Sequence, residues 1–181
     1  SIIALNLFAD DLEITGAINA GTVNVFTGGG AAPVTLGGDV QGPGFTLTEA
    51  ELNRFSRPTP TGISFSIFVD PQSGNSDPNA PDVILSDARL RGGLDSGFNF
   101  FNVFAGDGAS GTEGILRVEG LFEIANASSS RFTFTAADRI EIVTPGGLSI
   151  TNPDTLPTGA IDLDANNIWV ADAATITQLQ T

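Results

Sequence analysis

The sequence predicts an all-β protein of the solenoid type, in which repeated strand pairs stack on one another. The first observation is a phrase that occurs three times, at residues 5–14, 132–142 and 161–170, with one extra residue in the middle copy. Each copy has an apolar-x-apolar strand, a corner of small residues with Asp or Asn, and a second apolar-x-apolar strand. A strand pair of this length cannot bury its apolar face alone, but it can do so when it is stacked on copies of itself.

The second observation is that apolar residues alternate with other residues along most of the chain. A period of two is typical of half-buried β-strands. The 22 Gly and 10 Pro residues fit the many tight corners that short strands need. By itself this spacing is compatible with a sandwich, a barrel or a β-helix. The alternating sets include Leu5/Leu7, Leu12/Ile14, Val23/Val25, Ile63/Phe65/Ile67, Phe98/Phe100, Leu116/Val118, Phe122/Ile124 and Leu148/Ile150.

Helical signals are sparse, and no interval resembles an interdomain linker. Thr48 is a candidate N-cap with Glu51 as its capping-box partner, which places Leu52 and Phe55 on one helical face. The length predicts one helical turn or an extended strand-corner unit. A second short unit, helical or extended, is expected at 85–90. Loops are expected at 28–33, 70–82 and 106–114. We therefore expect one domain over 1–181, with an irregular or loop-rich middle at about 62–114.

Composition excludes several classes of function. The chain has 21 acidic residues against 7 basic ones, all of them Arg, for a net charge of −14. Such a surface repels nucleic acid and anionic membranes. Cys, His, Lys, Met and Tyr are absent, so disulfides, thiolate sites and His-dependent triads are excluded. No apolar run is long enough to span a bilayer as a helix, and the first residues lack the features of a signal peptide.

Acidic residues offer two kinds of chemistry. Asp162 and Asp164 alternate with Ile161 and Leu163, so both carboxylates face outward, where an acid/base pair of a carbohydrate-active enzyme would lie. The plainer interpretation is a solvated strand face.

Calcium is the second candidate ligand chemistry, because carboxylates are hard oxygen ligands. The corner acids also have a structural interpretation, in which they bond their own backbone or form ladders. We expect no required cofactor, with calcium as the alternative. The acids concerned are Asp10, Asp11, Asp70, Asp77, Asp82 and Asp138, and Asn167 occupies the equivalent corner of the last copy.

Two aromatic positions stand out. Trp169 lies between Ile168 and Val170, so alternation places it on the outside as a candidate surface contact for sugars or subunits. Phe100 and Phe101 are adjacent, so either one of them points outward or a bulge turns it inward.

The alternating pattern extends to both ends, and neither end shows the polar cap that a solenoid needs in water. The candidate assembly-end residues are therefore Ile3, Leu5, Leu7, Ile176 and Leu179. Bare ends predict that further rungs follow in a longer protein or that subunits stack end to end. The alternative is a globular domain whose terminal strands lie inside a sheet.

Four stretches, at 9–21, 44–54, 132–142 and 160–176, resemble the repetitive shaft of the filamentous haemagglutinin family, the large secreted β-solenoid adhesins of Gram-negative bacteria. The resemblance covers under half of the chain, and 62–114 departs from it. It implies a right-handed parallel β-helix, secretion to the cell surface, and adhesive or scaffolding work, with no catalytic residues to carry over.

We therefore expect a shaft segment of a surface adhesin, or a subunit of an extracellular fibre assembled by rung stacking. Its expected partners are itself, neighbouring repeats, and glycans or surfaces, without nucleic acid. The alternatives are a β-helix enzyme that acts on carbohydrates and a calcium-stabilised binding module.

Overall fold

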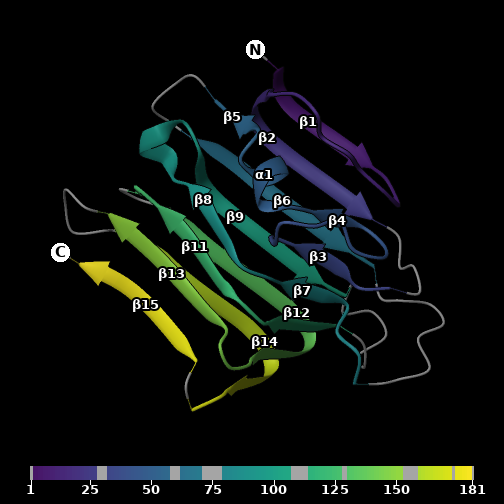
Figure 1. Cartoon of the computed structure of the whole chain (residues 1–181), viewed down its shortest axis with the longest axis vertical. Helices are drawn as coiled ribbons and strands as arrows, with labels where there is room; N and C mark the ends of the chain where they lie inside the picture. Colours follow the sequence, from purple (N-terminus) through teal and green to yellow (C-terminus); the bar gives the residue numbers. More distant parts are fainter. Residues whose placement is uncertain are drawn as a thin grey trace.

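The computed structural model describes residues 2–27, 32–57, 62–70, 79–106, 114–127, 130–152, 159–172 and 174–180. Regular structure in these ranges is almost entirely β-strand, and the strands pair in parallel (Figure 1). The all-β prediction is confirmed. The strands are β1 (Ile2–Phe8), β2 (Ile18–Thr27), β3 (Val34–Leu36), β4 (Thr46–Leu47), β5 (Phe55–Ser56), β6 (Ile63–Val69), β7 (Val83–Leu85), β8 (Ala88–Arg91), β9 (Phe98–Ala105), β10 (Ile115–Val118), β11 (Leu121–Ala125), β12 (Arg131–Ile142), β13 (Gly147–Asn152), β14 (Ala160–Val170) and β15 (Thr175–Gln180). A one-turn helix, α1 (Glu49–Leu52), and a 3-10 turn, η1 (Gly93–Asp95), complete the described elements.

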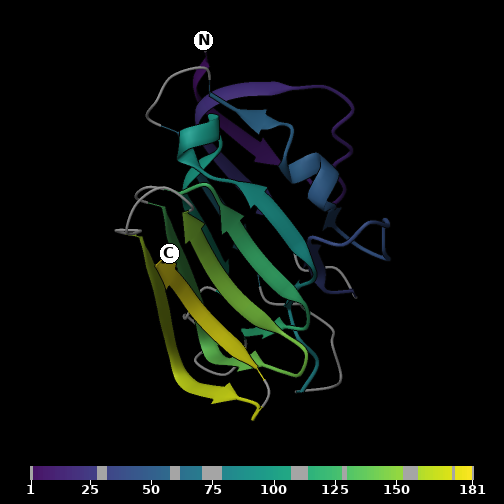
Figure 2. The same ribbon diagram turned by 60° about the vertical axis from the view of Figure 1, so that its left-hand side comes forward.

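The strands form two sheets that curl around one interior (Figure 2). The larger sheet has the order β1-β2-β6-β9-β12-β10-β7-β3-β4, with β14 beside β12 and β5 beside β2, and the smaller sheet has the order β15-β13-β11-β8. Parallel neighbours need long connections, so most neighbours in a sheet are not consecutive in the chain. The pairs β1 with β2 and β3 with β4 are the exceptions among the described strands.

From β6 onward the chain visits three stacks in turn. The first stack holds β6, β9 and the first halves of β12 and β14; the second holds β7, β10 and the second halves of β12 and β14; the third holds β8, β11, β13 and β15. Figure 1 places β1 at one end of the molecule, and β14 and β15 at the other.

The core consists of inward side chains that lie in register across successive strands. In the first stack one such column is Val23, Phe65, Phe101, Phe132 and Ile161. Phe122 of β11 closes the interior, with its ring centroid 5.3 Å from Phe101 and 5.7 Å from Phe132. Parallel registry therefore buries like side chains on like, as the repeated phrase predicts.

The second and third copies of the phrase lie side by side, with Phe132 opposite Ile161. The extra residue of the middle copy falls at the corner, where the register shifts between Ala136 and Arg139. The first copy behaves differently. Its first half is β1, but residues 9–17 form no strand, so the strand expected at Leu12/Ile14 is wrong. The buried Ile14 donates its amide to a side chain, Glu51 Oε1 at 3.0 Å, instead of to a neighbouring strand.

Within the described residues, the middle of the chain contains the long strands β6 and β9. Strands β6 and β9 lie at the centre of the larger sheet, and their buried positions include Phe65, Phe98 and Phe101. The register between these strands shifts, since Ile63 pairs with Phe98 whereas Ser64 pairs with Phe100. The expected bulge is present, but it leaves Phe100 outside, 44% exposed, while Phe98 and Phe101 are fully buried.

Helix α1 confirms the predicted capping box. Thr48 accepts from the amide of Glu51, and the Glu51 carboxylate accepts from the amide of Thr48. The second expected unit, at 85–90, takes the extended alternative, because β7 ends at Leu85 and β8 begins at Ala88.

The helix binds the edge of β8 through side chains rather than through a strand. Glu49 Oε2 and Asn53 Oδ1 accept from the amides of Arg89 and Arg91, each at 3.0 Å, and Asn53 Nδ2 donates to the carbonyl of Arg89. The helix therefore covers the edge of the third stack at β8.

No helix in the described ranges has the length and apolarity to cross a bilayer. The expected loops at 28–33, 70–82 and 106–114 fall largely outside the described residues.

Candidate assembly surface

The C-terminal side of the molecule presents two edge strands, β14 and β15 (Figure 1). Among the described strands, β14 pairs only with β12, and β15 only with β13. An edge strand offers a row of backbone donors and acceptors to an incoming strand.

Apolar side chains on these strands are uncovered because no layer lies beyond them in the described residues. Ile168 and Val170 are 44% and 49% exposed, whereas their register partners Ile140 and Ile142 are buried. Ile176 is 45% exposed and follows the buried Leu148 in the third stack. These residues continue columns of the core, so a further layer of strands would bury them.

Trp169 lies on the outer face of β14 and is 61% exposed, which agrees with the outward position expected from the sequence. Beside it is a shallow, mainly apolar hollow of about 390 Å³, lined by Glu141, Ile142, Val143, Trp169, Val170 and Ala171. The guanidinium carbon of Arg139 lies 5.4 Å from the centre of the indole ring, a cation–π distance.

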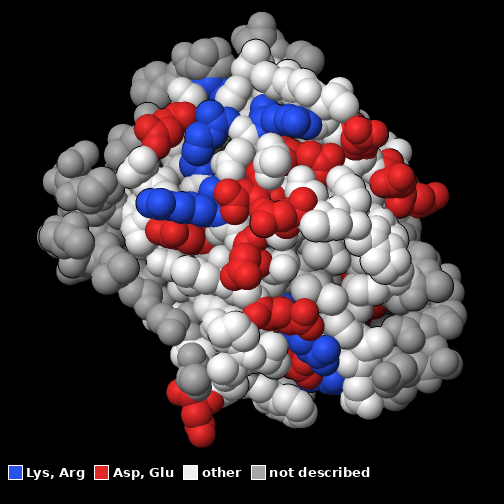
Figure 3. Space-filling view, in the orientation of Figure 1, with Lys and Arg blue, Asp and Glu red and all other residues white. Residues whose placement is uncertain are grey.

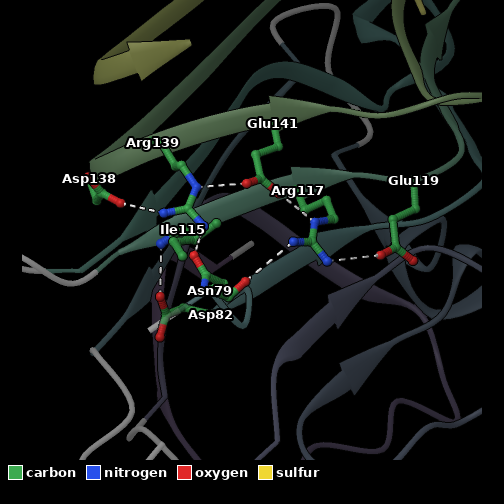
Figure 4. A network of polar contacts seen from close by, with 8 residues as sticks. All are labelled: Asn79, Asp82, Ile115, Arg117, Glu119, Asp138, Arg139 and Glu141. Atoms are coloured by element: carbon green, nitrogen blue, oxygen red, sulfur yellow. Dashed lines mark hydrogen bonds and ion pairs between the residues drawn. The ribbon is translucent and has the colours of Figure 1, made fainter. Parts of the chain in front are cut away.

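A polar network holds this face together (Figure 4). Glu141 is buried, and its two oxygens accept from Arg117 Nε at 2.6 Å and Arg139 Nε at 2.7 Å. Arg139 also contacts Asp138 at 2.8 Å, and both guanidinium groups donate to Asn79 at 3.4 Å. The network therefore ties β10 to β12 and fixes the chain segment that leads into β7.

Burial by itself raises the pKa of Glu141, but hydrogen bonds and charge from Arg139 and Arg117 outweigh it and hold the pKa below 4.5. The two guanidinium groups therefore favour the charged form of the Glu141 carboxylate.

Replacing Glu141 with alanine is expected to lower the free energy of unfolding by about 1–3 kcal/mol, because two partly buried cations lose an acceptor. Glu119→Ala is the matched control, since Glu119 contacts the same Arg117 at 3.9 Å but is 45% exposed. A surface pair of that kind contributes less than about 1 kcal/mol. Urea denaturation of both variants measures the difference, and equal losses would contradict the central role of Glu141.

The residues expected at the opposite end lie in β1, which is itself an edge strand. Leu5 and Leu7 are half-buried and pack against the core, and Ile3 belongs to the same strand. Leu179 lies in β15 with Ile176. The structure thus places the two predicted sets on opposite edges.

The carboxylates suggested for catalysis do not form an isolated pair. Asp162 Oδ2 binds Arg131 Nε at 2.7 Å, and Asp164 is exposed on the same strand. On the face that carries α1 and β8, basic side chains lie among acidic ones rather than in a patch (Figure 3).

The acids suggested for calcium are dispersed. No group of three or more candidate metal-ligating side chains occurs within the described ranges. Asp138 binds Arg139, Asp82 accepts from the amide of Ile115 at 2.8 Å, and Asp77 lies outside the described residues.

Sequence reasoning missed an outward column of phenylalanines. Phe8, Phe26, Phe68 and Phe104 stack on one another outside the core. The sequence did contain a signal for this column. Each of these phenylalanines directly follows an apolar residue that is buried or half-buried, so the alternation of the strand places the phenylalanine on the outer face.

Comparison of this chain with protein-family models, curated proteins and solved structures found no match.

Proposed function

We propose that this chain is a structural element of a right-handed parallel β-solenoid, extended at its C-terminal edge by a further layer of parallel strands. The added layer comes from following repeats of a longer chain or from a second copy. Its work is mechanical, as a shaft segment of a surface adhesin or a subunit of an extracellular fibre.

The observation that carries this proposal is the row of uncovered core positions on β14 and β15. Ile168, Val170 and Ile176 continue buried columns and lie beside unpaired strand edges. From β6 onward, successive strands join the first, second and third stacks in turn, and this order supports a solenoid. Crossovers between parallel strands are right-handed in about 98% of cases, which supports the right-handed form. The sequence phrases that resemble the haemagglutinin shaft support the adhesive and extracellular role.

In the third stack, the proposed growth has one direction. The edge of β8 is bound by α1, so an incoming strand cannot pair there without displacing the helix. The C-terminal side has no such obstruction among the described residues. A new layer therefore adds beyond β14 and β15 by strand augmentation, with main-chain hydrogen bonds for affinity and core columns for register.

Ile176→Asp is expected to abolish concentration-dependent assembly of the chain, because a carboxylate would enter the interior column of the added layer. Analytical ultracentrifugation and electron microscopy measure the assembly. Leu121→Asp is the matched control, since Leu121 is also 45% exposed but lies on β11 between paired strands. Assembly that survives in Ile176→Asp, or that is lost equally in Leu121→Asp, would contradict the proposal.

A further inference from the structure

Four phenylalanines form a continuous stack on the outer surface of the first stack of strands. Phe8, Phe26, Phe68 and Phe104 come from β1, β2, β6 and β9 at one register position. Their ring centroids are 4.7, 4.9 and 4.7 Å apart, and the ring planes differ by 11°, 9° and 2°. We call these four residues the Phe ladder.

The Phe ladder is not part of the core. The side chains that bracket Phe26 in β2, Val25 and Thr27, are buried, whereas Phe26 itself is only partly covered. Phe8 at the end of the ladder is 77% exposed, so one ring face is uncovered by any neighbour in the described residues. Large apolar side chains in a row on the outside of a sheet mark a contact surface.

A groove of about 510 Å³ runs along one end of the ladder. It is lined by Phe8, Ala9, Asp10, Phe26, Thr27, Phe68 and Asp70. Its length covers three successive rings, from Phe8 to Phe68. A site of this size accepts a small organic molecule.

The charge of the groove selects the ligand. Asp10 and Asp70 are exposed, and neither carboxylate forms an ion pair with the arginines of the described chain. The whole chain carries a net charge of −14, so a cation gains further from the surrounding field.

The ring geometry sets the shape of the ligand. Stacked rings present their electropositive edges sideways, and these edges attract the electron-rich face of an aromatic ligand laid across them. The uncovered face of Phe8 is electron-rich and attracts a positive charge. An elongated, planar aromatic body fits along the ring edges, and a cationic end brings its charge beside Asp10 at the Phe8 end of the groove.

We propose that this groove binds small planar aromatic cations, which lie along the Phe ladder with the positive charge between Phe8 and Asp10. The groove lies on the outer face near β1, away from the β14 and β15 edges, so its occupancy is measured separately from assembly at those edges.

The probe is thioflavin T, a planar aromatic cation whose fluorescence rises when it is immobilised. With the unmodified chain we expect saturable binding to a single site. Phe68→Ala and Phe8→Ala are each expected to weaken binding at least tenfold, and Asp10→Asn with Asp70→Asn several-fold. Phe8→Ala keeps the test independent of folding, since this side chain is mostly exposed.

Phe100→Ala and Asp164→Asn are the matched controls. Phe100 is an outward phenylalanine on the same sheet but outside the ladder, and Asp164 is an exposed carboxylate beyond the ladder's other end. Both are expected to bind the dye as the unmodified chain does. An uncharged dye of the same shape is expected to bind more weakly, with no response to the Asp10 and Asp70 changes.

Three outcomes would overturn the proposal. The first is no saturable binding to the folded chain. The second is unchanged affinity in both phenylalanine variants, and the third is an equal loss in Phe100→Ala, which would mean general adsorption to the sheet. Dye binding tests the groove, and the Ile176→Asp variant tests assembly at the C-terminal edge. The two proposals can therefore fail separately.

Discussion

Phe101→Ala is expected to lower the free energy of unfolding by about 3–5 kcal/mol, the usual effect of truncating a large core aromatic residue. Phe101 is fully buried and contacts four other core rings: Phe65, Phe98, Phe122 and Phe132. Its loss leaves a cavity at the centre of the larger sheet, where neighbouring strands on both sides hold the backbone in place.

The neighbouring residue provides the control. Phe100 has the same chemistry and lies on the same strand, but it faces outward and is 44% exposed. Phe100→Ala is expected to cost less than about 1 kcal/mol. Chemical denaturation followed by circular dichroism measures both variants. Equal losses would mean that β9 does not hold this register, since a shift of one residue exchanges the two faces of a strand.

Glu51→Ala is expected to lower the free energy of unfolding by about 2–4 kcal/mol, because several buried donors lose their acceptor together. The carboxylate accepts from the amides of Ile14 and Thr48 at 3.0 Å, and from Gln41 Nε2 and the Thr48 hydroxyl at 2.8 and 2.9 Å. One side chain thus joins α1 to two loops at the N-terminal side.

The contribution of Glu51 depends on pH in a defined direction. Burial alone raises the pKa of Glu51, but hydrogen bonds from Ile14, Thr48 and Gln41 outweigh it and lower the pKa below 4.5. A lowered folded-state pKa means that the stabilisation is fully present above the unfolded value and is lost as the pH falls through the folded value. The difference in stability between the unmodified chain and Glu51→Ala should therefore shrink in acid.

Glu13→Ala is the control for this series. Glu13 precedes Ile14 in the segment 9–17, but its side chain is exposed. It is expected to change stability by no more than about 0.5 kcal/mol. Thermal unfolding across the acidic range measures all three proteins. A pH-independent difference between the unmodified chain and Glu51→Ala would contradict the assigned network.

Local sequence signals predicted the strands and the helix cap well. The alternation of Val23/Val25 and Leu116/Val118 reports which side chains face the core, because a strand has only two faces. The capping box at Thr48 and Glu51 was also readable, since both partners lie within one turn of the chain.

Contacts between distant segments were not readable in this way. Glu51 bonds Ile14 across 37 residues, and Arg117 bonds Glu141 across 24. Such partners are set by which strands become neighbours. For the same reason, the first copy of the phrase could not be recognised as only half a strand pair.

The sequence by itself determined that this is an all-β chain with alternating faces, an acidic surface and a repeated corner phrase. These properties follow from residue type and from the period of two. Only the tertiary structure decided the parallel register, and with it the stacking of out-of-phase phenylalanines into a ladder, the cover of α1 over β8 and the uncovered columns at β14 and β15. The parallel register places equivalent positions of successive strands beside one another. One outward phenylalanine therefore becomes part of a ladder only because the neighbouring strands carry phenylalanine at the same register position.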